Sequence, residues 1–254
     1  MALIGNIAVV AGGSRGIGRA TAIELARQGA DVGIIYRSAD DAAAAVCAEI
    51  ESLGRRALAI RADASDASAV ASAFASIRAE LGLPAMVVNS IGAASEEKYI
   101  HDQSPDEFRA FIAVDLFAAY NVIHNAVRTL REAGGGGIVA MSSIATQMMP
   151  TRNGAGAASK AATEALIKVV AREEARHAIR ANAVSIGITD TDMVRPLFAK
   201  WGEAATSKIL AGMPLGRIGQ PQEVASMIAY LLDERASYIT GKVFQVDGGQ
   251  FIGG

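Results

Sequence analysis

The sequence predicts a single doubly wound α/β domain, a seven-stranded parallel sheet with helices on both faces. Short apolar runs recur between longer segments of helical periodicity. The runs are nearly continuous rather than alternating, as is typical of strands buried on both faces. The length of 254 residues also suits one α/β domain, so we expect residues 1–254 to form one unit with right-handed parallel crossovers.

The expected strands are the short apolar runs themselves. In chain order they are Ile4–Ala11, Asp31–Tyr36, Ala57–Ile60, Ala85–Asn89, Gly137–Met141, Ala181–Ser185 and Lys242–Val246. The segments between them carry the helical pattern and supply the crossovers.

Start signals locate several helices. Ser104–Glu107 supplies a cap residue, a proline at the first helical position and a glutamate at N3, and the apolar pattern continues to about Leu130. A second long, alanine-rich helix is expected over Ala155–His177, and Gln220–Glu223 opens the last helix. Thr191–Gly216 is weakly patterned, and we predict that it is a lid over a substrate site.

Composition excludes several classes of function. The chain is 51% hydrophobic and 20% charged, which provides a sizeable core, and its net charge of −2 argues against a nucleic-acid partner. The single Cys47 cannot form an internal disulfide, and the histidines show no metal-ligand spacing, so we expect no metal. Met1–Ser14 lacks a basic region, and the uncharged run Ala133–Thr151 is too polar for a lipid-spanning helix. We expect a cytoplasmic protein with no membrane contact.

A glycine-rich turn follows the first strand and opens the first helix. It reads Ala-Gly-Gly-Ser-Arg-Gly-Ile-Gly over Ala11–Gly18. Bare glycine backbone lets N–H groups approach a pyrophosphate, and the helix N-terminus adds partial positive charge there. A plain tight turn is the alternative, but the coincidence of strand, glycines and helix favours a Rossmann-type dinucleotide site. Its expected contacts are Gly12, Ser14, Arg15, Gly16, Ile17 and Gly18.

The end of the second strand indicates which dinucleotide the site takes. An acidic side chain there would accept hydrogen bonds from a free ribose 2′-hydroxyl, but the sequence reads Tyr36-Arg37-Ser38. Arg15 and Arg37 offer guanidinium donors to a 2′-phosphate, so we predict NADP(H) in preference to NAD(H). The alternative is that these arginines are solvated surface charges.

Several further motifs resemble the short-chain dehydrogenase/reductase family, particularly its 3-oxoacyl-carrier-protein-reductase-like branch, along essentially the whole chain. The glycine turn is similar to the family's TGxxxGxG, and Asn89–Gly92 to its NNAG. Asp63 resembles the family's adenine-contacting acid, although a helix-capping aspartate is the open alternative. Tyr238–Gly241 and Val246–Gly249 resemble its C-terminal signature.

The resemblance implies the residues that handle cofactor and substrate. Ser143 matches the serine that orients a substrate carbonyl, and Lys160 matches the lysine that binds the nicotinamide ribose. In the family that lysine also lowers the pKa of a tyrosine one helical turn before it, which exchanges the proton. The implied cofactor contacts beyond the glycine turn are Arg37, Asp63, Asn89, Gly92, Lys160, Gly187, Thr189 and Thr191.

The sequence departs from the family at the positions that would carry out proton transfer and lie beside the nicotinamide. Gly156 stands four residues before Lys160, where the resemblance places the tyrosine, and no tyrosine lies between Ser143 and Lys160. Asp115 replaces the usual asparagine of a catalytic tetrad, and Ile186-Gly187 replaces Pro-Gly. Loss of a positioned general acid costs a factor of about 10² to 10⁴ in rate.

Several substitutes for the missing acid stay open. Water held by Ser143 and Lys160 could relay a proton. The Asp115 carboxylate would tune Lys160 if it faces inward, and otherwise it is a structural or solvated acid. Tyr99 and His101 are either substitute donors or exposed residues of the substrate wall.

Three functions follow from these expectations. The first is an NADP(H)-linked oxidoreductase of carbonyl and alcohol substrates with a proton source other than tyrosine. The second is a degenerate NADP-binding subunit that partners an active paralogue in a heteromer, and the third is elimination or isomerisation on the same fold. The alanine-rich helices and the glycine-rich tail resemble the family's subunit interfaces, so we expect a homotetramer or a dimer.

Overall fold

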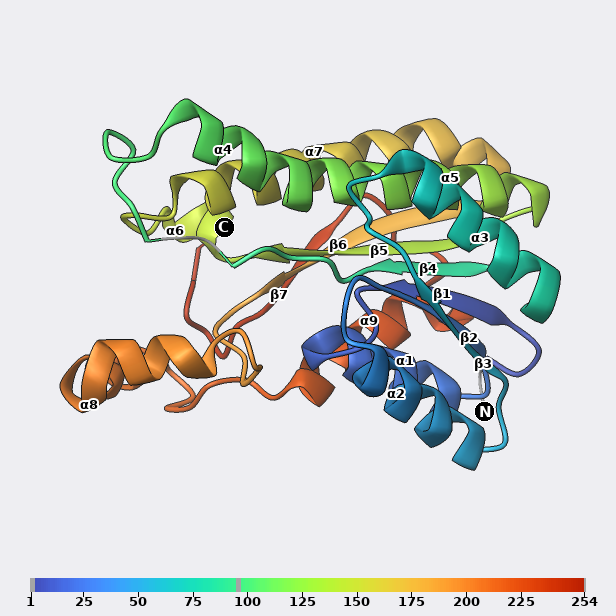
Figure 1. The fold of residues 1–254 in the computed structure, drawn as a ribbon, viewed down its shortest axis with the longest axis horizontal. Helices are drawn as coiled ribbons and strands as arrows, with labels where there is room; N and C mark the ends of the chain where they lie inside the picture. Colours follow the sequence, from blue (N-terminus) through green and yellow to red (C-terminus); the bar gives the residue numbers. More distant parts are fainter. Residues whose placement is uncertain (1–2, 95–96, 254) are drawn as a thin grey trace.

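A computed structural model describes residues 3–94 and 97–253, and it contains a seven-stranded sheet in the order β3-β2-β1-β4-β5-β6-β7. Every neighbouring pair is parallel. The order reverses between β1 and β4, and ligands of open α/β sheets bind at the carboxyl ends of the strands beside such a reversal (Figure 1). The predicted fold class is confirmed.

The strands match the predicted apolar runs closely. They are β1 Ile7–Ala11, β2 Asp31–Tyr36, β3 Ala57–Arg61, β4 Met86–Asn89, β5 Gly136–Ser143, β6 Ile179–Ile186 and β7 Val243–Val246. The first strand begins later than expected because Gly5, at φ +82°, lies in a turn. β5 and β6 are longer than their apolar runs because they pair with each other as far as Ser143 and Ile186.

Helices cover both faces of the sheet, as Figure 1 shows. On one face lie α3 Ala67–Leu81, α4 Pro105–Ile112, α5 Ala118–Glu132 and α7 Gly154–Glu174. On the other lie α1 Gly16–Arg27, α2 Asp40–Ser52 and α9 Pro221–Leu232. Alternate residues of β1 serve the two resulting cores: Val9 and Ala11 pack with α3 and α5, whereas Val10 packs with α1 and α2. This double burial explains why the strands read as continuous apolar runs.

The predicted long helix after Ser104 is interrupted. Ser104 Oγ accepts the backbone N–H of Glu107 at 3.2 Å, and Glu107 Oε2 accepts that of Ser104 at 2.9 Å, which confirms the capping box. A π-helical turn, Ala113–Phe117, separates α4 from α5, and it carries the buried Asp115. By length and a mean hydropathy of 1.4, Pro105–Glu132 would also suit a membrane span. Here it forms part of the helical layer over the sheet (Figure 1).

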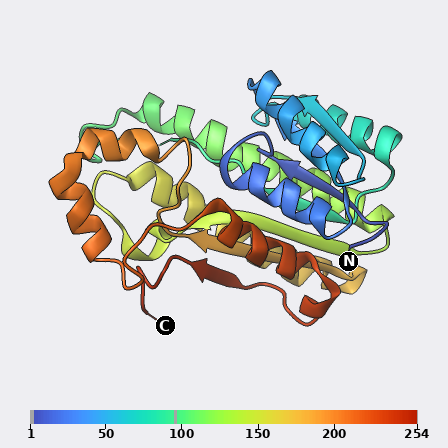
Figure 2. The same ribbon diagram turned by 90° about the horizontal axis from the view of Figure 1, so that it is seen from below.

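The expected lid segment is largely helical. α8, Arg195–Ala211, projects from one end of the molecule, away from the two helical layers (Figures 1 and 2). Gly202, at φ +80° and ψ +170°, kinks it. The short helix α6, Ala145–Met148, links β5 to the approach to α7.

Candidate cofactor and substrate site

The glycine turn forms a bare backbone cradle between β1 and α1. A Cβ on Gly12 would lie 2.9 Å from the carbonyl oxygen of Ser90, and a Cβ on Gly18 would collide with the carbonyl of Gly12. Gly12 and Gly16 also have positive φ, at +81° and +53°. Side chains would therefore fill the cradle, as the motif predicted.

A cavity of about 420 Å³ borders this turn. A Cβ on Gly16 would lie 3.4 Å from Thr191 Cγ2, so the loop after β6 touches the turn. The cavity brings together four of the predicted contacts, Ser14, Arg15, Gly16 and Thr191. Ile17 lies behind the turn and is buried in the core.

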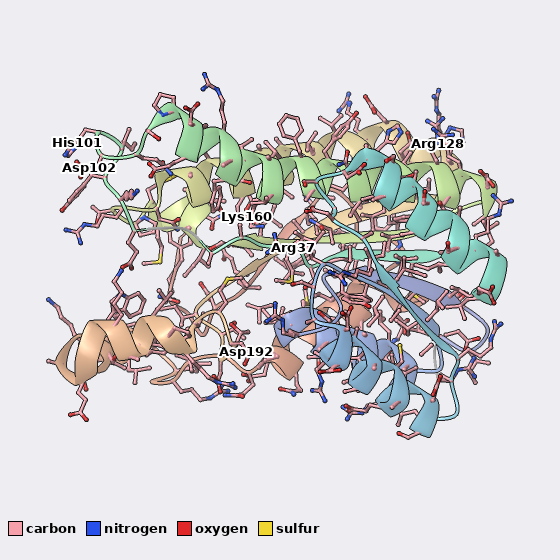
Figure 3. The ribbon with its side chains drawn as sticks, viewed as in Figure 1. Arg37, His101, Asp102, Arg128, Lys160 and Asp192 are labelled. Atoms are coloured by element: carbon pink, nitrogen blue, oxygen red, sulfur yellow. The ribbon has the colours of Figure 1, made fainter. Side chains whose placement is uncertain are left out.

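Arg37 and Asp63 lie beside each other at the ends of β2 and β3. Arg61 Nε donates to the carbonyl oxygen of Arg37 at 3.2 Å, and Arg37 itself is exposed (Figure 3). Hydrogen bonds from the hydroxyl and backbone N–H of Ser65 hold the pKa of Asp63 below its usual value, and the Arg37 charge acts in the same direction. The helix-capping alternative for Asp63 is wrong, because Asp66 caps α3 through Ser68 and Ala69.

Asn89 closes the cradle from the end of β4. Its side chain is fully buried, and in the part of the chain that the structure describes neither its amide nitrogen nor its amide oxygen has a partner. A buried polar group without a partner costs about 1–3 kcal/mol, so a ligand that bonds Asn89 would relieve that cost. Together with the glycine cradle, this side chain fits a dinucleotide at the sheet edge.

Lys160 is held by a buried carboxylate. Asp115 is fully buried and faces inward, and its Oδ1 lies 3.0 Å from Lys160 Nζ. Ser159 Oγ donates to the same oxygen at 2.6 Å, and the backbone N–H of Ala93 donates to Oδ2 at 2.9 Å. Lys160 Nζ also donates to the carbonyl oxygen of Ile91 at 3.1 Å. Asp115 therefore faces inward and is not a solvated acid.

Lys160 also lies against the turn after β4. Its Nζ is 3.9 Å from the position of a Cβ on Gly92. The network thus ties α7 to the turn that follows Asn89 and fixes an ammonium group at the carboxyl end of β4, the sheet edge where open α/β folds form their ligand crevice (Figure 3).

Ser143 ends β5, and a buried acid supports the chain around it. The backbone N–H of Ala145 donates to Ser143 Oγ at 3.2 Å. Glu164 Oε1 accepts from Ser142 Oγ at 2.5 Å and from Thr146 Oγ1 at 2.9 Å. Sequence analysis missed Glu164, although its place one helical turn after Lys160 puts it on the same face of α7.

Gly156 lies in the first turns of α7, beneath the side chain of Asn153. A Cβ on Gly156 would overlap Asn153 Oδ1 and lie 3.1 Å from its Cγ. Asn153 Oδ1 is buried, and among the described residues it has no hydrogen-bond partner. Sequence analysis missed Asn153; an asparagine before a helix is a cap signal, but nothing in the local pattern marks the space over Gly156.

Tyr99 and His101 lie on an exposed loop. Their rings stack with centroids 5.6 Å apart, and the guanidinium of Arg152 lies 4.6 Å from the Tyr99 centroid. Figure 3 places His101 at the tip of the loop, away from Lys160. This position favours residues of an outer wall over substitute proton donors.

The loop after β6 is held by the C-terminal segment. The backbone N–H of Gly187 donates to the carbonyl oxygen of Val246 at 3.0 Å, and a Cβ on Gly187 would lie 2.7 Å from Asp247 Cα. Thr189 is buried, and its hydroxyl donates to the carbonyl oxygen of Gly187 at 3.1 Å. Gly187, Thr189 and Thr191 are therefore placed along one loop beside the cradle.

The lid segment is tied to the loop after β4. Glu97 accepts from Lys200 Nζ and from Trp201 Nε1, each at 3.1 Å. These bonds join α8, close to its kink at Gly202, to the loop after β4. The sequence did not reveal this link. Among the described residues, no group of three or more His, Cys, Asp or Glu gathers as a metal site.

Comparisons with known proteins agree with this geometry. A family model described as Enoyl-(Acyl carrier protein) reductase matches residues 11–250. The chain is 33% identical to the 3-oxoacyl-[acyl-carrier-protein] reductase FabG of Pseudomonas aeruginosa, over 99% of this chain and 100% of the relative. A short chain dehydrogenase from Burkholderia cenocepacia, solved with NADP, superposes with a TM-score of 0.89 at 34% identity, covering 98% of this chain and 99% of the other. The chain belongs to the short-chain dehydrogenase/reductase family.

The family fixes the class of chemistry. This short-chain dehydrogenase/reductase is by family an oxidoreductase of carbonyl and alcohol substrates that uses a nucleotide cofactor. A 7 alpha-hydroxysteroid dehydrogenase solved with NADH superposes with a TM-score of 0.91 at 29% identity, covering 97% of this chain and 94% of the other. Structural neighbours therefore include both an NADP complex and an NADH complex.

Proposed function

We propose that this chain is an NADP(H)-linked oxidoreductase of small carbonyl and alcohol substrates, with Ser143 and Lys160 as catalytic residues and Gly156 where the family has tyrosine. The observation that carries the proposal is the Asp115 network, which holds the Lys160 ammonium at the crevice beside Gly92.

The residues of the crevice have separate tasks. A bound nicotinamide cofactor would supply or accept hydride. The backbone N–H groups of the glycine turn would hold its pyrophosphate, with Asn89, Gly187, Thr189 and Thr191 lining the path. Ser143 Oγ donates a hydrogen bond to the substrate oxygen. Lys160 has three N–H donors, of which Asp115 and Ile91 accept two, so the third is left for a ligand.

The preference for NADP(H) rests on Arg37. It is exposed at the end of β2. Hydrogen bonds from Ser65 and the nearby Arg37 charge lower the pKa of Asp63, although the Arg37 and Asp63 side chains form no hydrogen bond with each other among the described residues. Arg37→Ala is expected to weaken NADPH binding about 10-fold or more while NADH binding changes little, because a charge-assisted hydrogen bond contributes about 1.5–3 kcal/mol. Fluorescence titration at fixed salt measures both affinities.

The exposed Arg128 on α5, remote from Arg37 in Figure 3, is the matched control. Arg128→Ala removes the same charge and should leave both affinities unchanged. Equal wild-type affinities for NADPH and NADH would remove the preference.

One assay separates the three candidate functions. Wild type is incubated with NADPH and a panel of small ketones and aldehydes, and NADPH oxidation and product are both followed. Oxidation coupled to alcohol formation supports the proposal. Tight NADPH binding without turnover favours a subunit that partners an active paralogue, whereas conversion of a substrate without NADPH oxidation favours elimination or isomerisation.

We further propose that residues 191–216 act as the substrate lid. Glu97 holds α8 across the crevice through Lys200 and Trp201, and the Gly202 kink lies immediately beyond Trp201. A glycine at positive φ is a suitable hinge because other residues are strained there.

Assembly is proposed on exposed apolar side chains. Phe117 and Tyr120 on the α5 side and Val169 on α7 are each about half exposed, and Tyr238 and Ile252 near the C-terminus are almost fully exposed. We expect a homotetramer, or a dimer, because a second copy of the chain would cover these residues. Sedimentation at micromolar concentration measures the mass, and a monomer would contradict the expectation.

A further inference from the structure

Asn153 occupies the N-cap position of α7, but its side chain does not cap the helix. It directly precedes α7, and its backbone carbonyl accepts the N–H of Ala157 at 3.0 Å. Asparagine is among the strongest N-cap residues because its side-chain oxygen accepts a free backbone N–H of the first turn. The Asn153 side chain makes no such bond, so its carboxamide is directed elsewhere.

The carboxamide lies over Gly156. The position of a Cβ on Gly156 is 3.1 Å from Asn153 Cγ and 3.4 Å from Nδ2, and it overlaps Oδ1. The missing side chain at Gly156 therefore makes the space that Asn153 fills. Spacings of three to four residues place Asn153, Gly156 and Lys160 along one face of α7.

Asn153 Oδ1 is buried, and no donor from residues 3–94 or 97–253 reaches it. Loss of hydration without a replacement hydrogen bond disfavours the unliganded fold. The backbone is not free to swing the group away, because Asn153 pairs as a β-bridge with Lys98 of the loop after β4. An acceptor fixed in this way is suited to a ligand that brings its own donor.

We propose that Asn153 Oδ1 accepts the hydroxyl of an alcohol substrate, at the base of the space that the family resemblance assigns to the tyrosine side chain, where the Cβ of residue 156 would lie. An alcohol carries the O–H that this oxygen lacks, whereas the matching ketone does not. A carboxamide does not titrate, so Asn153 binds the substrate oxygen and leaves the proton to another group. This inference rests on the proposed function.

The test replaces the carboxamide with apolar side chains. Asn153→Leu nearly preserves its shape, and Asn153→Ala keeps the inference testable if leucine does not fit. Both variants remove the unpaired oxygen, so the melting temperature Tm of the unliganded protein should rise by about 2–4 °C. The KM for cyclohexanol oxidation with NADP⁺ should rise about 10-fold, with a smaller change for cyclohexanone reduction and little change in kcat. NADPH affinity should not change.

Ser104→Ala is the matched control, because Ser104 caps α4 with its side chain. It should lower Tm and leave both KM values unchanged. A lower Tm for both Asn153 variants would make Asn153 structural, and an unchanged cyclohexanol KM would also overturn the inference. If wild type oxidises no alcohol and reduces no ketone, the proposed function fails and this inference fails with it; if wild type turns over and both Asn153 variants keep its cyclohexanol KM, this inference alone fails.

Discussion

The double variant Gly156→Tyr/Asn153→Ala is expected to reduce a small ketone with NADPH about 10² times faster, or more, than Asn153→Ala alone. A positioned general acid contributes a factor of that size, and the rest of the set is in place. Lys160 is fixed by Asp115 and Ile91, and Ser143 ends the neighbouring strand.

Asn153 must be removed in the same variant. A tyrosine at position 156 would place its Cβ on Asn153 Oδ1. Gly156→Tyr alone is therefore expected to raise the rate of ketone reduction less than the double variant does. Gly156→Ala/Asn153→Ala is the control for backbone effects, since alanine in a helix interior is favoured over glycine by about 1 kcal/mol. Steady-state rates over a ketone panel, with Tm as the check on folding, measure the gain.

A well-folded double variant that binds NADPH but reduces no ketone faster than Asn153→Ala does would contradict the interpretation of Gly156 as a lost tyrosine. The partner-subunit and altered-chemistry hypotheses would then be favoured, because the crevice would no longer admit a phenol beside a bound carbonyl.

The sequence predicted the elements that depend on local pattern. The inner strands were found because burial on both faces demands continuous apolar residues, and the glycine turn because Gly12 and Gly18 leave no room for side chains. The capping box at Ser104 identified the start of α4 for the same local reason.

The contacts that make the site depend on distant segments. Asp115 contacts Lys160 because it lies in a π-helical turn, and no periodicity in the sequence predicts that turn. Asn153 reads as an ordinary loop residue until the space over Gly156 is visible. α8 was read as weakly patterned chain because it projects from the body and its described side chains form no buried stripe that would set a helical period.

Removal of the Asp115 carboxylate is expected to lower stability more than any other single change proposed for this chain. The side chain of Asp115 is 1% exposed and that of Lys160 is 13% exposed, so Asp115→Ala would leave a largely buried ammonium without its counter-charge. Breaking one side of such a pair costs about 3–5 kcal/mol, which corresponds to a Tm decrease of about 6–20 °C for a chain of this size. The Ser159 hydroxyl and the Ala93 N–H would lose their acceptor as well.

Two further variants show whether charge is the cause. Asp115→Ala/Lys160→Met removes both charges and should recover much of the lost Tm, because the remaining cost is a cavity and two unpaired donors rather than a buried ion. Asp106→Asn breaks the exposed pair with Arg109, whose side chains are 92% and 74% exposed, and it should change stability by less than about 1 kcal/mol. Thermal unfolding of the four proteins gives the comparison. An Asp115→Ala variant as stable as Asp106→Asn would mean that solvent in the crevice already screens Lys160, and the buried pair would then not be what fixes the ammonium in place.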